Sequence, residues 1–185
     1  MTPSELLNRL ESDLLQLQAT MRTDFFEKSA ETLLRRPHPD AWSALDCFAH
    51  LNGELEYYLL RLERAQHKAK ARRWMPTEDV QSNWTGRRAI QSVDVQTGTW
   101  KAHRAHNTLD PLKTRPVREN EVKILLINLE VLIRLVRQSH EIDLNRPKIR
   151  PQYWSLAHFY MGDLLEYLTR HIQRHVLQAE RSMAA

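Results

Sequence analysis

Apolar residues recur at helical spacing in separate stretches of the chain, and this pattern predicts an all-α protein. The stretches run from about Pro3 to Leu34, from Ser43 onward, from about Glu119 to His140, and from about Trp154 to Met183. Residues three or four positions apart share one face of a helix, so each stretch carries a single apolar stripe. The stripes of the first three stretches are Leu6, Leu10, Leu14, Leu17 and Met21; Phe48, Leu51, Leu55, Leu59 and Leu62; and Val122, Leu125, Leu129, Leu132 and Val136.

Helices that each carry one apolar stripe must bury those stripes against one another. The pattern therefore favours an antiparallel four-helix bundle that comprises residues 1–185 as one domain. Residues 69–117 show no sustained period and contain several prolines and glycines, so we expect a long irregular connection with short helices between helices 2 and 3. A connection this long is uncommon in a compact domain unless it covers a site.

Local signals place the ends of the first two helices. Pro3 suits the first turn of a helix, where its missing N–H costs nothing. The prolines in Arg35–Pro39 disfavour helical geometry before them and end the first helix. Ser43 followed by Asp46 predicts a capping box at the start of the second helix, with Asp in place of the usual Glu.

The fourth stretch carries two histidines on its apolar stripe. The stripe runs through Ala157, Met161, Leu164 and Leu168, and its next two positions are His171 and His175. Burying an imidazole without a partner is costly, and a transition metal would satisfy both rings, since neutral imidazole is its commonest protein ligand. The alternatives are a surface pair on a basic helix, two hydrogen-bonded core histidines, or one histidine of each kind. The pair alone does not decide between them.

The composition bounds the class of protein. Hydrophobic residues make up 42% of the chain and charged residues 27%, as in ordinary globular proteins. No apolar run approaches the roughly 20 residues needed to cross a bilayer, and the first residues lack the pattern of a secretory signal. The single cysteine, Cys47, fits a reducing compartment. We therefore expect a cytoplasmic protein without a membrane span.

The net charge of +4 has its basic excess between His67 and Arg118, a region that also contains Trp74, Trp84 and Trp100. A nucleic-acid site combines a basic face with interleaved aromatic residues. However, no helix-turn-helix, RRM or KH pattern is present. We therefore favour a solvated loop rich in Lys and Arg over a nucleic-acid partner.

Three segments carry a resemblance to a known family. They are Ala41–Leu51 (Ala-Trp-Ser-Ala-Leu-Asp-Cys-Phe-Ala-His-Leu), Asp143–Pro147 (Asp-Leu-Asn-Arg-Pro) and Thr169–Ala179 (Thr-Arg-His-Ile-Gln-Arg-His-Val-Leu-Gln-Ala). In order and spacing they resemble the DinB superfamily of bacterial four-helix-bundle proteins, whose second helix carries one histidine before a Leu and whose closing helix carries His-x-x-x-His-x-x-Gln. Residues 69–117 match no part of that family that we can place.

The resemblance implies a divalent metal, such as zinc, nickel, manganese or iron, held by His50, His171 and His175. Three histidines leave at least one coordination position open, which is typical of a catalytic site. The implied function is a metal-dependent enzyme, either a hydrolase that activates water or a transferase that activates a low-molecular-weight thiol, acting on a small-molecule substrate. The alternative is a non-catalytic, stress-associated metal-binding helical interaction module. We expect a homodimer, as in many proteins of this kind.

Residues near these histidines suggest further roles. Glu54 follows His50 by one helical turn and is the one candidate we name for a catalytic acid or base; it could also orient an imidazole. The interpretation we favour for Glu54 is pairing with Arg61 or solvent. We expect Cys47 to be a packed core thiol rather than a nucleophile. Gln178 extends the histidine stripe by one step and is expected to hydrogen-bond there.

Two further groups are expected to be structural. His103 and His106 form a pair in the irregular connection, and we interpret them as loop surface. Several aromatic residues are expected to pack at the ends of the bundle, where they could line a pocket. These are Trp42, Tyr57, Tyr153 and Trp154.

Overall fold

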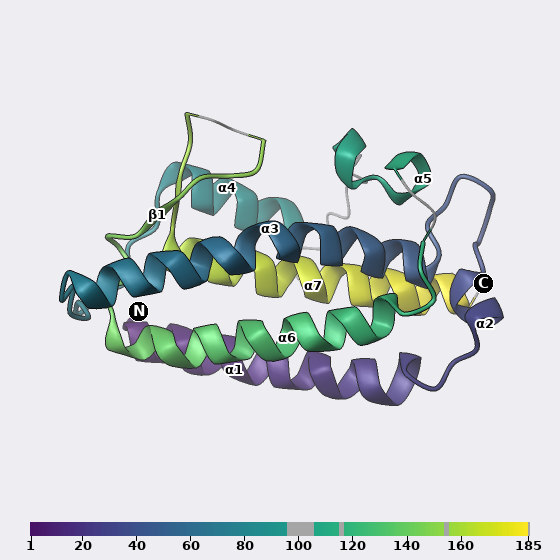
Figure 1. Cartoon of the computed structure of the whole chain (residues 1–185), viewed down its shortest axis with the longest axis horizontal. Helices are drawn as coiled ribbons and strands as arrows, with labels where there is room; N and C mark the ends of the chain where they lie inside the picture. Colours follow the sequence, from purple (N-terminus) through teal and green to yellow (C-terminus); the bar gives the residue numbers. More distant parts are fainter. Residues whose placement is uncertain (96–105, 115–116, 154–155, 185) are drawn as a thin grey trace.

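The computed structural model describes residues 1–95, 106–114, 117–153 and 156–184 (Figure 1). The described residues are mostly helical with almost no sheet, which confirms the predicted all-α class. The long helices lie side by side and are α1 (Pro3–Thr20), α3 (Ala44–Ala71), α6 (Glu121–Gln138) and α7 (Met161–Met183).

Helices α3 and α6 pack against each other and run in the same direction. The Asn52 side chain donates to the Glu121 carbonyl (3.0 Å) near the start of both helices, and Gln66 donates to the Leu135 carbonyl (2.6 Å) near their ends. This differs from the antiparallel arrangement predicted for the whole bundle. The reason is the long connection, which returns along the molecule before α6 begins.

The α1–α6 and α3–α7 pairings bring opposite directions together, whereas α1 and α7 run in the same direction. Helix α1 is antiparallel to α6, as the ion pairs of Arg22 with Glu130 (3.1 Å) and of Arg137 with Glu11 (2.7 Å) show. Helix α7 is antiparallel to α3 in Figure 1 and also packs on α1. The predicted stripes of α1, α3 and α6 are buried in the core between these helices.

The first helix is shorter than predicted. It ends at Thr20, continues as a short π-helix, η1 (Met21–Phe25), and is followed by a separate helix, α2 (Ala30–Leu34). The prediction of one helix to Leu34 is therefore wrong. The Phe26 N–H bonds the carbonyl of Met21 instead of continuing the α-helical pattern, and the Ser29 hydroxyl caps the new helix by accepting from the Thr32 N–H (3.2 Å).

The fourth helix also starts later than predicted, at Met161 rather than Trp154, which lies outside the described residues. The segment before it is extended: β2 (Phe159–Tyr160) pairs antiparallel with β1 (Lys148–Ile149). Ala157 therefore precedes the helix and does not belong to its stripe. The backbone pairing explains the difference, since it satisfies in the sheet the N–H and C=O groups that a helix would otherwise use.

The connection between α3 and α6 contains short helices, as predicted, and one of them packs on the core. They are α4 (Trp84–Val93), η2 (Asn107–Leu109) and α5 (Pro111–Thr114). Helix α4 lies against α7, where the absence of a side chain at Gly86 leaves room for Asp163. Across the described ranges, no helix combines the length and the apolar character that crossing a membrane requires.

Candidate metal centre

His50 is positioned by the first turns of α3, whose start is fixed by hydrogen bonds. The Ser43 hydroxyl accepts from the Asp46 N–H (3.2 Å), and the Asp46 carboxylate accepts from the Ser43 N–H (2.8 Å). Arg36 forms an ion pair with the same buried carboxylate (2.9 Å). The capping box predicted from the sequence is therefore confirmed. It defines where α3 begins and so where His50 lies, about two turns later.

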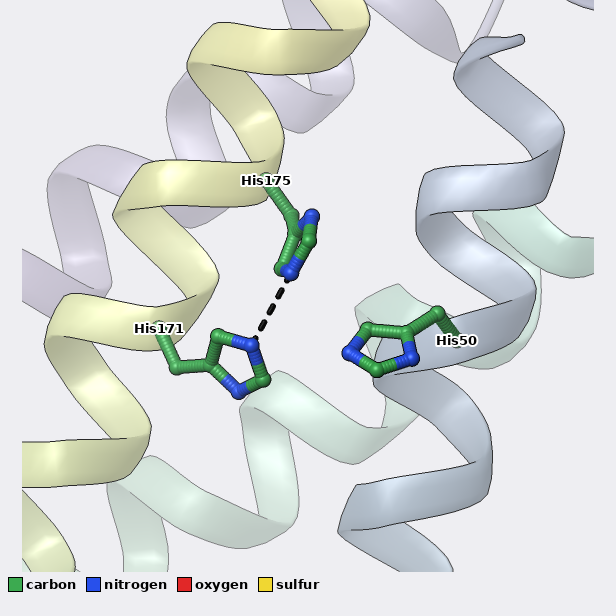
Figure 2. A group of neighbouring side chains, drawn as sticks. All are labelled: His50, His171 and His175. Carbon is green, nitrogen blue, oxygen red and sulfur yellow. Dashed lines mark hydrogen bonds between the residues drawn. The ribbon is translucent and has the colours of Figure 1, made fainter. Parts of the chain in front are cut away.

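His50, His171 and His175 come together between α3 and α7. Figure 2 shows the two rings from α7 beside the ring from α3. Each residue offers one ring nitrogen, and these atoms all lie within 4.8 Å of one another. The three residues are buried, with relative exposures of 6%, 7% and 7%. The three histidines identified in the sequence thus form one cluster that could hold a metal ion.

Each of the three imidazoles has its Nδ1 bonded to an oxygen that only accepts. The three acceptors are a backbone carbonyl, a side-chain amide oxygen and an ionised carboxylate. None of them can donate a hydrogen, so Nδ1 carries the proton in every ring. The Nε2 atom of each neutral ring then carries a lone pair. The pairs are His50 with the Leu109 carbonyl (2.9 Å), His175 with Gln178 Oε1 (3.0 Å), and His171 with Glu54 Oε2.

The Nε2 atoms of His171 and His175 are 2.9 Å apart, as the dashed line in Figure 2 marks. With both Nδ1 atoms protonated, two neutral rings would face each other with lone pairs, so a cation is needed between them. A proton on His50 or His175 is unfavourable. Burial, with His171 nearby, lowers the pKa of His50 to about 4 and lowers that of His175 well below its ordinary value.

The donor set fits a divalent transition metal. Nitrogen atoms that bind one ion at about 2.1 Å in adjacent positions lie about 3.0 to 3.4 Å apart, close to the spacing of His171 and His175. Acceptors on the far side of ligating imidazoles are typical of metal sites, because they fix the tautomer and the orientation of the ring. All three histidines have such an acceptor.

Glu54 pairs with His171 and not with Arg61, so the pairing we favoured from the sequence is wrong. Its Oε2 accepts from His171 and its Oε1 accepts from the Tyr167 hydroxyl (2.8 Å). Arg61 instead donates to the Tyr57 carbonyl (2.8 Å) and stacks on that ring. Burial raises the pKa of the Glu54 carboxyl, but His171 and the other donors outweigh it, so the pKa lies below its ordinary value.

The sequence did not identify Tyr167 or the Leu109 carbonyl as parts of the site. Tyr167 lies one turn before His171 on the same face of α7, so its helical spacing was an available signal. No sequence signal identifies the Leu109 carbonyl, because every residue has a backbone oxygen. It belongs to η2, which the connection brings against α3.

Trp42 covers part of the histidine cluster. Its ring stacks on His175, with centroids 5.7 Å apart and planes at 26°, and lies 5.0 Å from the ring of His50. The prediction of Trp42 as a packing residue is confirmed, with two imidazoles as its partners.

Two other predicted residues behave as expected. Cys47 is fully buried, and its burial, together with Asp46, raises the pKa of the thiol, which makes it an inert core residue. Gln178 hydrogen-bonds to this cluster, through the Nδ1 of His175.

The predicted loop histidines lie away from the cluster as far as the structure describes them. His106 is exposed, and its ring stacks on Tyr153 with centroids 3.8 Å apart. Its Nδ1 lies 3.0 Å from the Thr108 hydroxyl. The loop-surface interpretation is therefore confirmed for His106, and His103 lies outside the described residues.

The basic region contains one tryptophan that packs against the core. Trp74 is half-buried, with the cations of Lys68, Arg72 and Arg146 5.5 to 6.0 Å from its ring. Trp100 lies outside the described residues. A packed indole is less available for stacking on bases than an exposed one. The interpretation of this region as a solvated surface stays a prediction.

Comparisons with known proteins add no relative. The sequence matches no model of a protein family, no curated protein and no solved structure. The resemblance to the DinB superfamily therefore depends on the three segments that carry it, and the site has to be interpreted from its own geometry.

Proposed function

We propose that this chain is a divalent-metal-dependent enzyme of the DinB-like type, in which His50, His171 and His175 hold one transition-metal ion. One observation carries the proposal: three buried imidazoles direct Nδ1 outward to acceptors, and two of them bring Nε2 to within 2.9 Å of each other. His50, His171 and His175 also lie within two of the three segments that resemble the DinB superfamily. As part of this proposal, the four long helices form a four-helix bundle of that family.

The chemistry of such a site follows from its charge. Three neutral imidazoles leave the charge of a divalent ion uncompensated and at least one coordination position open. A bound divalent ion supplies Lewis acidity, which lowers the pKa of a water molecule or thiol that enters the open position. Glu54 acts through His171, because it holds the ring in place and increases the basicity of Nε2. We therefore treat Glu54 as a positioning residue.

Of the two nucleophiles, we favour a thiol. A free thiol has a pKa of about 8.5, whereas that of water is about 15.7, so a thiol needs a much smaller shift to react as an anion. The Glu54 carboxylate accepts from His171 and Tyr167, so we assign it to positioning rather than to proton transfer at the open position. We propose transfer of a low-molecular-weight thiol to a small electrophile, with hydrolysis as the second candidate.

The test is turnover by metal-loaded protein. We expect cysteine and chlorodinitrobenzene to give thioether faster with the enzyme than without it, and we expect His171→Ala to remove the enhancement. His67→Ala is the matched control, since His67 is an exposed histidine on α3. Nitrophenyl esters, assayed without thiol, test the hydrolase.

The outcomes separate the candidates. Thiol-dependent turnover that is lost in His171→Ala and retained in His67→Ala supports the transferase. Ester hydrolysis without thiol, lost in the same variant, replaces it with the hydrolase. Bound metal with neither activity, across a range of electrophiles and esters, favours the non-catalytic interaction module.

A further inference from the structure

A pocket of about 380 Å³ lies beside the histidine cluster, between α3, α4 and the segment that precedes α7. This volume is in the range of sites for small molecules. Glu54 and Tyr167 line the pocket, each one helical turn from a histidine of the cluster, whereas the histidines do not. The pocket is therefore distinct from the proposed metal position, and the Glu54 carboxylate lies between the two.

The inner end of the pocket is negatively charged. Glu54 is buried with 6% relative exposure, and buried Tyr58 and Phe159 lie beside it in the lining. The carboxylate accepts one hydrogen bond from Tyr167 and one from His171, out of about four that a carboxylate can accept. It can therefore accept further hydrogen bonds, and a desolvated negative charge favours a cationic donor.

The outer end is positively charged. Arg88 on α4 is exposed and lies over the Trp84 ring, with its guanidinium carbon 5.7 Å from the centroid. Within the described parts of the chain, no carboxylate forms an ion pair with Arg88. The neighbouring Arg87, by contrast, donates to the Ser82 carbonyl (2.6 Å) and does not line this pocket. The Arg88 donors are therefore available for an anion.

The same lining includes the aromatic side chains of Tyr58, Tyr153, Phe159 and Tyr167. Phe159 stacks on Tyr167 with centroids 5.8 Å apart and packs edge-on against Tyr58 at 6.3 Å. Rings of this kind favour a flat, apolar body over a flexible polar chain. A buried carboxylate, an exposed guanidinium and aromatic rings in one lining define the chemistry of an occupant.

We propose that this pocket binds a small zwitterion with a flat apolar body, whose amine pairs with Glu54 and whose anionic group pairs with Arg88. An amine that carries its anion at the opposite end of a ring satisfies both charges at once. A molecule with one charge leaves either the buried carboxylate or the guanidinium without a partner. Metal occupancy is not required for this binding, because no lining residue is a histidine of the cluster.

The test uses three probes of nearly equal shape: para-aminomethylbenzoate, para-methylbenzylamine and para-methylbenzoate. Their dissociation constants are measured by calorimetry on metal-free protein and again after incubation with zinc. We expect the zwitterion to bind about tenfold more tightly than either singly charged probe in both samples. Equal dissociation constants in the metal-free and zinc-treated samples would show that this binding does not depend on the metal centre.

Substitutions test which pocket residue pairs with which charged group of the zwitterion. Arg88→Gln is expected to remove the advantage of the zwitterion over para-methylbenzylamine, and Glu54→Gln its advantage over para-methylbenzoate. Arg87→Gln, the matched control, is expected to leave all three affinities unchanged. Equal affinity for the three probes, failure of the zwitterion to bind at millimolar concentration, or an Arg88→Gln protein that binds like the unaltered chain would overturn the proposal.

Discussion

His171 and His175 bring their Nε2 atoms to 2.9 Å while the Nδ1 of each ring donates to a different acceptor. In this tautomer the two neutral rings direct lone pairs at the same point. Burial lowers the pKa of His175, so a proton placed there is unfavourable. We infer that the arrangement is built for a metal ion, and the predictions below test that inference together with the packing that supports it.

Glu54→Gln is expected to weaken metal binding by about 10- to 100-fold, because it removes the anionic acceptor that orients His171. Competition with a chromogenic chelator measures the affinity. Glu56→Gln makes the same chemical change at an exposed position of α3 and is expected to bind metal like the unaltered chain. Equal affinities for the Glu54→Gln and Glu56→Gln proteins would show that Glu54 does not position the ligand.

Tyr167→Phe is expected to lower the free energy of unfolding by about 1 to 3 kcal/mol, because a buried carboxylate loses one of its donors. Metal affinity should fall less than in Glu54→Gln, since the contact with His171 remains. Urea unfolding and the same chelator competition measure the two effects. A larger loss of affinity than in Glu54→Gln would mean that Tyr167 has a direct role at the centre.

The metal-free protein is expected to lose stability as the pH falls from about 6.5 towards 4. The pKa of His50 is 6.5 ordinarily and about 4 in the folded chain, so the unfolded state takes up the proton first. The contribution of His50 to the free energy of unfolding is therefore complete above pH 6.5, where it amounts to about 3 kcal/mol. It declines as the pH falls across this window. The lowered pKa of His175 acts in the same direction.

Urea unfolding with a chelator, repeated across this pH range, measures that dependence. His50→Gln keeps a donor for the Leu109 carbonyl but cannot titrate, so its stability should change less with pH. An unchanged slope in this variant would show that His50 is not the group responsible.

Gly86→Ala is expected to destabilise the packing of α4 on α7. A Cβ at this position would lie 2.1 Å from the Cγ of Asp163, whose carboxylate accepts from the Asn83 N–H at the start of α4. Overpacking of this kind costs about 1 to 3 kcal/mol, more than the helix propensity that alanine adds. Thermal unfolding measures the change, with Gln91→Ala on the exposed side of α4 as the control. A gain in stability would show that α4 is not packed on α7 in this way.

The sequence was sufficient for the features that depend on local chemistry. The apolar stripes identified the faces of α1, α3 and α6 that are buried, and Ser43 with Asp46 identified the start of α3. His171 and His175 could be placed on one face because their spacing is fixed by the helix. His50 required more than spacing, since it comes from another helix, and the resemblance supplied it.

Features that depend on contacts between distant segments were not predictable in this way. Glu54 and Arg61 are seven residues apart on one helix, which suggested pairing, but Glu54 is bonded to Tyr167 and His171 on a helix more than 100 positions away. The parallel direction of α6 depends on the path of the connection, which has no periodic pattern. The start of α7 depends on the pairing of β1 with β2, which involves only two residues in each strand.

The most direct test of the metal centre is metal content by plasma mass spectrometry, on tag-free protein purified without added metal. His50→Ala, His171→Ala and His175→Ala are measured beside it, with His67→Ala as the control and circular dichroism as the check of folding. We predict about one divalent ion per chain in the unaltered and His67→Ala proteins, with strong loss in each of the other three. An unaltered protein that contains no metal, and takes up none from zinc, nickel, manganese or iron, would contradict the three-histidine centre.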